Sequence, residues 1–379
     1  MYPMLTTNVL RPLWNLARRG RPIPARWYST KTTRMPYRRV KAVMVSRLPL
    51  AVTTPDQATA QANRIFTALR EGNALERDAE TLVFVLLPEF GLNRGLHPHA
   101  PGYDPEDGSD WSALCPVRKA TYDAFCQAVR DQMLALPPGI VLASGGTAVD
   151  SGEELPDGKR KGWNTGFVME SGKDAQAIAY AKINHELNDG WDRDVFVPGL
   201  PDPQTGMLLH KIGAVTTFTL TCYDMTRAKL PPLSQVDAIL AGTKGAPDWQ
   251  GKLLDQGLRK GSLVLVNELT EVPQYGGLAT GPQGFFKADD LPNYPKFQQF
   301  YEVAQLAGLG DAAVRAYSYL FDVARDDLLG KHLGFAKQPM VTTKHTAERE
   351  GTLSIRISAP IELGNIQGDW VDAEDAEKE

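Results

Sequence analysis

The segment "TLVFVLLPEF" (residues 81–90) decides the fold class of this 379-residue chain. Six apolar residues, Leu82 to Leu87, follow one another without a polar interruption. A run of this kind predicts a strand covered on both faces, because a half-exposed strand would alternate apolar and polar side chains. Such strands are typical of α/β proteins. The run ends at Pro88, and Glu89 follows where the strand meets a loop.

Predicted strands and helices alternate along the rest of the chain. We expect further strands at 39–46, 139–150, 162–171, 175–184, 212–222, 236–242, 262–268 and 352–363, and helices at 55–72, 117–136, 248–261, 297–308 and 311–330. Some of the strands are separated by hairpin-like turns. The pattern predicts an α/β fold with mixed sheets. No clear linker divides residues 39–365, so we expect one domain there, with a Gly/Pro-rich loop or lid at 91–116.

Composition excludes several classes of protein. The chain is 42% hydrophobic and 23% charged, as expected of a soluble globular protein. No apolar run approaches the ~18 residues of a membrane span, so we expect no membrane association. The three cysteines, Cys115, Cys126 and Cys222, cannot form a disulfide framework, and we expect a reducing compartment.

Charge is distributed unevenly. Residues 1–55 contain eleven Lys and Arg and no acid, which leaves 30 bases against 45 acids in the remainder. An acidic body argues against nucleic-acid binding. Residues 1–38 are basic, acid-free and amphipathic, and we interpret them as an unstructured mitochondrial targeting segment. An ordinary basic tail, a bacterial secretion signal of an effector and a cytosolic form starting at Met35 are the alternatives. Residues 366–379 form an acidic tail that we expect to be disordered.

Three common site motifs are absent. "GAPDWQGKL" (245–253) resembles a phosphate-binding loop but is one residue too long and has Leu253 in place of the magnesium-binding hydroxyl residue. "NHELND" (184–189) has no second histidine at metal-ligand spacing, so we predict no metal site. No G-x-S-x-G segment indicates a serine hydrolase.

Three predicted strands end in different reactive groups, namely Glu89, Lys182 and Cys222. Each of the three has an ordinary structural explanation on its own, as a solvated strand end, an edge lysine or a buried thiol. Together they form a chemical set. A thiol of ordinary pKa needs a base or a positive neighbour to react at neutral pH. A glutamate can accept its proton, and a lysine can stabilise the charge that develops on a substrate oxygen.

The segments around these residues resemble the three signatures of the nitrilase, or carbon–nitrogen hydrolase, superfamily, which uses Glu, Lys and Cys in this chain order. They are "LLPEF" (86–90), "YAKINHEL" (180–187) and "FTLTCYDMTR" (218–227), supported by "WNTGFVMESG" (163–172) and "FVPG" (196–199). The resemblance implies a four-layer α-β-β-α sandwich that pairs through helices into a larger symmetric sandwich, as a homodimer or higher assembly. It also implies that no cofactor is needed.

Carried over residue by residue, the resemblance makes Cys222 the nucleophile and Glu89 the general base. Lys182 and the backbone N–H of Tyr223 would hold the oxyanion. The family's second glutamate corresponds to Asp192, one methylene shorter, with Glu186 and Asp189 as rivals.

The residues after the nucleophile depart from the family pattern. "CYDMTRAKL" lacks the usual phenylalanine–proline–glutamate, and Asp224 and Arg227 there could simply fix a local turn. The pair Tyr223–Asp224 resembles amidase-type members, so we expect hydrolysis of a small amide or carbamoyl compound. A catalytically silent scaffold or effector that binds a protein partner, nitrile hydrolysis, and acyl transfer to another acceptor remain alternatives. The loop 91–116 and the helices within 297–330 differ from the common pattern, and the substrate is not predicted.

Overall fold

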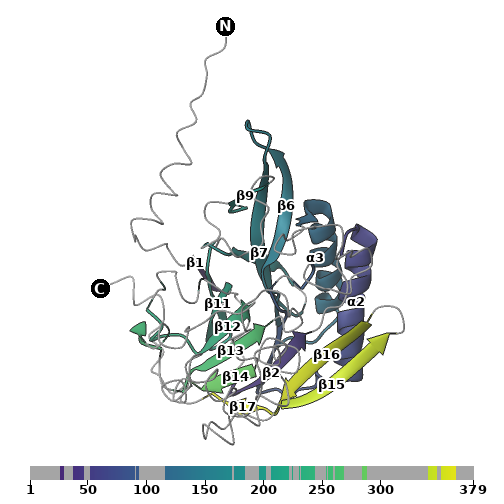
Figure 1. The fold of residues 1–379 in the computed structure, drawn as a ribbon. Coiled ribbons are helices and arrows are strands. Elements are labelled where there is room, and N and C mark those ends of the chain that lie inside the picture. The colour runs from purple at the N-terminus through teal and green to yellow at the C-terminus, as the bar shows by residue number, and fades with distance from the viewer. Residues whose placement is uncertain are drawn as a thin grey trace, which may run out of the picture.

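The structure is a computed structural model of the chain (Figure 1). It describes residues 26–29, 37–46, 52–89, 91–93, 116–172, 175–183, 196–201, 206–221, 224, 230, 232–243, 253, 255–258, 261–268, 284–287, 340–347 and 351–363.

The smaller of two sheets has six strands in the order β1-β10-β11-β12-β13-β14. These are β1 (Arg26–Ser29), β10 (Leu208–Ile212), β11 (Val215–Thr221), β12 (Ala238–Thr243), β13 (Leu263–Glu268) and β14 (Gly284–Lys287). Strands β11, β12 and β13 run parallel to one another. Strand β10 is antiparallel to β11 and parallel to β1, and β14 is antiparallel to β13. The sheet is therefore mixed.

The larger sheet has eleven strands and is also mixed. Its main path is β15 (Met340–Ala347), β16 (Gly351–Ser358), β2 (Arg39–Ser46), β3 (Thr81–Leu86), β5 (Ile140–Ala143), β7 (Arg160–Glu170), β6 (Thr147–Glu154) and β4 (Val117–Arg118). The side branches are β17 (Ile361–Glu362) on β2, and β8 (Ala177–Ala181) and β9 (Phe196–Gly199) on β7. Strands β2, β3 and β5 are parallel at its centre.

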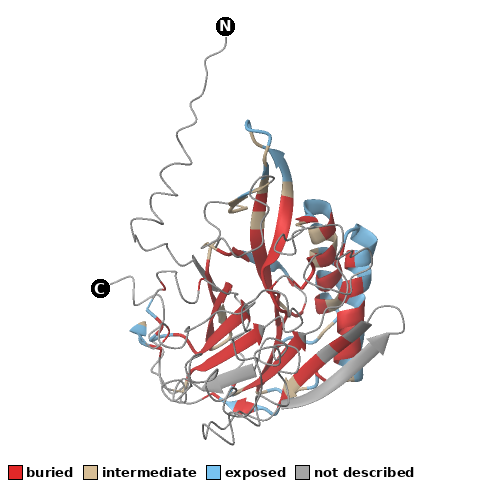
Figure 2. Cartoon of the chain, in the orientation of Figure 1, coloured by how far each residue is buried: buried red, intermediate tan, exposed pale blue. Residues whose placement is uncertain are grey.

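The two sheets pack face to face, and helices α2 (Pro55–Glu71) and α3 (Lys119–Leu134) cover the outer face of the larger one (Figure 1). Strand β3 shows the layering. Leu82, Phe84 and Leu86 lie in the core between the sheets, while Val83 and Val85 lie in the core under the helices. Both faces of β3 are therefore buried (Figure 2), as its unbroken apolar run predicted.

The predicted α/β class with mixed sheets is confirmed. Helix α2 begins as its sequence predicts. Thr54 and Gln57 form a capping box, in which the side chain of each residue accepts a hydrogen bond from the backbone N–H of the other. No helix within the described residues is long and apolar enough to cross a membrane.

Some predicted elements differ from the structure. The single strand expected at 139–150 is wrong, since β5 and β6 are separate strands with residues 144–146 between them. Strand β10 was not predicted, because residues 208–212 alternate too weakly to stand out. Most of the loop 91–116 and the helices within 297–330 lie outside the described residues. Of the helix expected at 248–261, residues 253, 255–258 and 261 are described. Leu253 and Asp255 are helical, but Gly257 has a φ of +74°, so the helix does not continue to 261 as expected.

Within the basic N-terminal segment, residues 26–29 and 37–38 are described. Arg26–Ser29 form β1, which pairs in parallel with β10 at the edge of the smaller sheet. The expectation of an unstructured segment through residue 38 is therefore wrong for these four residues. Targeting to mitochondria stays a prediction, and residues 1–25 and the tail 366–379 lie outside the described residues.

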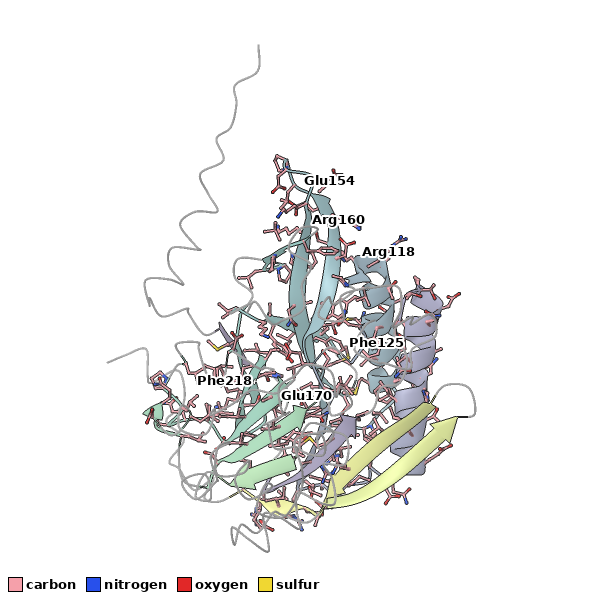
Figure 3. The ribbon with its side chains drawn as sticks, viewed as in Figure 1. Arg118, Phe125, Glu154, Arg160, Glu170 and Phe218 are labelled. Atoms are coloured by element: carbon pink, nitrogen blue, oxygen red, sulfur yellow. The ribbon has the colours of Figure 1, made fainter. Side chains whose placement is uncertain are left out.

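Strands β6 and β7 extend as a hairpin beyond the body of the larger sheet, and the tip of the hairpin is exposed (Figure 2). Glu154 and Arg160 lie opposite each other in the backbone register at the outer end of this hairpin (Figure 3). Arg160 also forms an ion pair with Asp150, and Lys161 Nζ lies 3.1 Å from Glu153 Oε2. These charges balance one another within the hairpin.

A buried histidine is among the titratable side chains between the sheets. His210 lies on the same face of β10 as Leu208 and Ile212, which belong to the inter-sheet core. It is fully buried. Neither ring nitrogen has a hydrogen-bond partner among the described residues. Burial lowers the pKa of His210 to about 4, since the low-dielectric surroundings disfavour the imidazolium.

We predict that this histidine makes the fold sensitive to acid. Its folded-state pKa lies below its ordinary value of 6.5, so the stabilisation is complete above pH 6.5 and is lost as the pH falls through 4. The loss in free energy of unfolding attributable to His210 would approach about 3 kcal/mol. Urea denaturation between pH 7 and pH 4 should show a steeper decline for the wild type than for His210→Leu. Parallel curves would contradict this prediction.

Candidate active site

The end of β3 places Glu89. Leu87 still donates its backbone N–H to the carbonyl of Ala143 on β5, at 2.9 Å. Pro88 has no N–H to donate, so the ladder stops there and the chain turns at Glu89. The carboxylate is consequently delivered to the carboxyl-end edge of the parallel strands, where sites in α/β sheets form. Glu89 is fully buried.

A glycine lets the chain between β5 and β6 contact this turn. A Cβ atom on Gly145 would lie 2.2 Å from the carbonyl carbon and oxygen of Pro88 and 2.4 Å from the backbone nitrogen of Glu89. No larger residue fits, because the neighbouring atoms are backbone and cannot swing away. The interruption at 144–146 thus holds the backbone of Glu89 in place.

Lys182 comes directly after β8 and meets Glu89. Its backbone N–H donates to the carbonyl of Asn164 on β7 at 2.9 Å, and its Nζ donates to Glu89 Oε1 at 3.1 Å. Both side chains have 0% exposure. Removing two charges from water costs several kcal/mol for each ion, and the attraction between them offsets this cost only in good geometry with further hydrogen bonds. A buried pair of this kind points to a chemical role more than to stability.

Asn164 supplies one of those further hydrogen bonds. Its Nδ2 donates to Glu89 Oε1 at 2.9 Å, and the residue is fully buried on β7. The sequence reasoning did not single out Asn164. A signal was present, since a carboxamide interrupts the inward-facing positions of a strand whose neighbouring inward residues are Gly166 and Val168.

The end of β11 lies next to Asn164. A Cβ atom on Gly146 would lie 2.1 Å from Asn164 Oδ1 and 2.9 Å from Thr221 Cγ2, so both side chains pack against that glycine. Tyr180 on β8 donates its hydroxyl to the carbonyl of Ser144. Burial raises the pKa of Tyr180, the nearby Thr221 hydroxyl partly opposes that effect, and the charge of Glu89 adds to it. Thr221, Tyr180 and Glu89 are therefore close neighbours.

Asp224 joins the segment after β11 to the segment after β8. Its Oδ2 accepts a hydrogen bond from the backbone N–H of Ile183, the residue that follows Lys182, at 3.0 Å, and the side chain is fully buried. Asp224 therefore does more than fix a local turn. Arg227, its suggested local partner, lies outside the described residues.

The structure thus brings two of the predicted site residues, Glu89 and Lys182, into direct contact. The remaining predicted site residues lie outside the described residues, namely Cys222, Tyr223, Asp192, Glu186 and Asp189. Thr221 and Asp224, on either side of the pair 222–223, both contact the neighbourhood of Lys182 and Asn164.

Comparison with known proteins finds similarity among solved structures. No family model matches the chain, and no curated protein does. The fold is similar to the crystal structure of a carbon–nitrogen hydrolase from Helicobacter pylori G27, with 12% sequence identity and a TM-score of 0.36. The match covers 66% of this chain and 79% of that one. Similarity at this level assigns no family, so the functional assignment depends on the residues of this chain.

We predict that the two ions of the buried pair depend on each other. Lys182→Met should lower the free energy of unfolding at pH 7 by about 3–5 kcal/mol, because it leaves the Glu89 carboxylate buried without its cation. The double variant Lys182→Met/Glu89→Gln should recover a large part of that loss. Chemical denaturation of the two single variants and the double variant gives the coupling between them. Additive losses would show that the two side chains do not interact.

Proposed function

We propose that this protein is a thiol hydrolase that cleaves a non-peptide carbon–nitrogen bond, with Cys222 as nucleophile, Glu89 as general base and Lys182 as oxyanion-stabilising cation. The observation that carries the proposal is the 3.1 Å contact between Lys182 Nζ and Glu89 Oε1 in a fully buried site. An acid and a base held together at the carboxyl-end edge of a sheet serve acyl-transfer chemistry well.

Chain geometry supports the assignment of Cys222. Consecutive Cα atoms are about 3.8 Å apart, and Cys222 follows Thr221 directly. Thr221 packs against Gly146 together with Asn164, the residue that binds Glu89. Two residues beyond Cys222, Asp224 binds the backbone next to Lys182. The described residues on both sides of 222 and 223 thus contact the segments that carry the other two groups.

Cys126, the cysteine among the described residues, is a poor nucleophile. Cys126 on α3 is partly buried against the core under the helices, and burial raises its pKa to about 12. A thiol with so high a pKa is almost entirely protonated at neutral pH and hence unreactive. This contrast favours Cys222 over Cys126.

The reaction would proceed in two halves. Glu89 takes the proton of the Cys222 thiol as sulfur attacks the amide carbonyl, and Lys182 stabilises the negative oxygen of the tetrahedral intermediate. Glu89 then gives that proton to the departing nitrogen, the carbon–nitrogen bond breaks, and a thioester remains on Cys222. Water attacks the thioester, Glu89 accepts its proton, and the carboxylic acid leaves while the proton returns to sulfur. The sum is an amide and water giving an acid and ammonia or an amine.

Further parts of the proposal come from the resemblance of the sequence to the nitrilase superfamily. The backbone N–H of Tyr223 would be a second oxyanion donor, and Asp192 would keep Lys182 protonated and oriented. The pair Tyr223–Asp224 favours an amide or carbamoyl substrate over a nitrile. Assembly as a homodimer or larger oligomer belongs to the same proposal.

We predict that Cys222→Ala abolishes turnover. Ammonia release, screened against small amides, ureido acids and nitriles, should fall by at least about 10³-fold, because no other group can form the covalent intermediate. The amide class should give the highest wild-type rate.

Cys126→Ala is the matched control, since it removes the thiol that lies within the described residues without touching Glu89 or Lys182. It should retain turnover. Full activity of Cys222→Ala, with a folded protein shown by circular dichroism, would refute the proposed function.

A further inference from the structure

Two hydrogen bonds meet at one oxygen of the Glu89 carboxylate. Oε1 accepts a hydrogen bond from Asn164 Nδ2 at 2.9 Å and another from Lys182 Nζ at 3.1 Å. A carboxylate oxygen has two lone pairs in the plane of the group, so these two donors occupy both. A proton could bind Oε1 only by displacing one of them. Proton uptake by Glu89 is therefore directed to Oε2.

Asn164 is fixed in the orientation that this requires. Its side chain packs against Gly146, whose missing Cβ leaves room for Oδ1. Rotating the carboxamide by half a turn would set its oxygen against the Glu89 carboxylate, where two acceptors would repel each other. The backbone of Asn164 is held in β7 between β6 and β8, and its carbonyl accepts the N–H of Lys182. One residue thus positions both the acid and the lysine.

We propose that Asn164 is a positioning residue that makes Oε2 the proton-accepting oxygen of Glu89 and favours the ionised carboxylate. This inference rests on the proposed function, since it concerns the base that would accept the thiol proton of Cys222. In the first step the thiol proton moves to Oε2 while Oε1 stays bonded to Asn164 and Lys182. In the second step the same proton leaves Oε2 for the departing nitrogen, and the two bonds at Oε1 are unchanged throughout.

Replacing Asn164 therefore has a defined chemical effect. Asn164→Leu keeps the approximate size of the side chain and removes the N–H donor. The Glu89 carboxylate then holds a proton more tightly, because one hydrogen bond that favours its charged form is gone. The pair formed by Glu89 and Cys222 should lose its first proton at a higher pH.

The experiment measures this proton directly and needs no substrate. The full-length protein is treated with iodoacetamide at a series of pH values, and the rate of alkylation of Cys222 is followed by peptide mass spectrometry. The rising limb of the rate against pH should move upward by about one pH unit in Asn164→Leu, which is a tenfold change in proton affinity. If Asn164→Leu does not fold, Asn164→Ser, whose hydroxyl is too short to reach Glu89, takes its place with the same expectation.

Asn267→Leu is the matched control. Asn267 is equally buried and faces the same layer between the sheets, but its Nδ2 donates to the backbone carbonyls of Val45 and Leu86. Its loss should lower the stability and leave the alkylation profile in place. If the alkylation profile shifts equally in the Asn267 and Asn164 variants, the role of Asn164 is structural only and the inference is overturned.

Glu89→Gln separates this inference from the proposed function. If Glu89→Gln leaves the alkylation profile unchanged, Cys222 is not coupled to Glu89 and the proposed function fails. If Glu89→Gln changes the profile while Asn164→Leu does not, the proposed function stands and only the role of Asn164 is wrong.

Discussion

The fully buried contact between Glu89 and Lys182 is the interaction on which the rest of the account depends. It joins the ends of β3 and β8, two strands that are not neighbours in the larger sheet. Such a pair is expensive to bury and stable only when its hydrogen bonds are completed. Asn164 adds a hydrogen bond to the carboxylate, and Gly145 lets the chain pack closely against the backbone of Glu89. These neighbours hold the two charged side chains together out of contact with solvent.

The layer between the sheets is apolar on one side and polar on the other. Around β2, β3, β12 and β13 it consists of apolar side chains that bind the two sheets together. Toward β8 and β11 the inward positions are polar, with Thr217, Thr219 and Thr221 following one another on β11. Tyr180 stands opposite them and bonds to the carbonyl of Ser144. The apolar part supplies cohesion, and the polar part surrounds the charged pair.

Sequence alone predicted the α/β class and singled out Glu89 and Lys182, which the structure brings into contact, because these features have local signals. The unbroken apolar run before Pro88 marks a strand buried on both faces, and the alternating strand before Lys182 marks another. The contribution of Asn164 was not predictable in the same way, since it depends on the pairing of β7 with β8 and on which face of β7 turns inward. The role of Gly145 could not be predicted from the sequence either, because it depends on a contact with Pro88, 57 positions earlier. The β5–β6 interruption was missed for the same reason.

The central claim is that Cys222 becomes acylated with the help of Glu89 and Lys182. The most direct measurement uses p-nitrophenyl acetate, an activated acyl donor, with rapid acid quenching and peptide mass spectrometry to locate the acetyl group. The account predicts a burst of p-nitrophenolate, acetylation of Cys222 in the wild type, and much slower acetylation in Glu89→Gln. Acetylation of Cys222 at the same rate in Glu89→Gln, or acetylation at another residue, would contradict it.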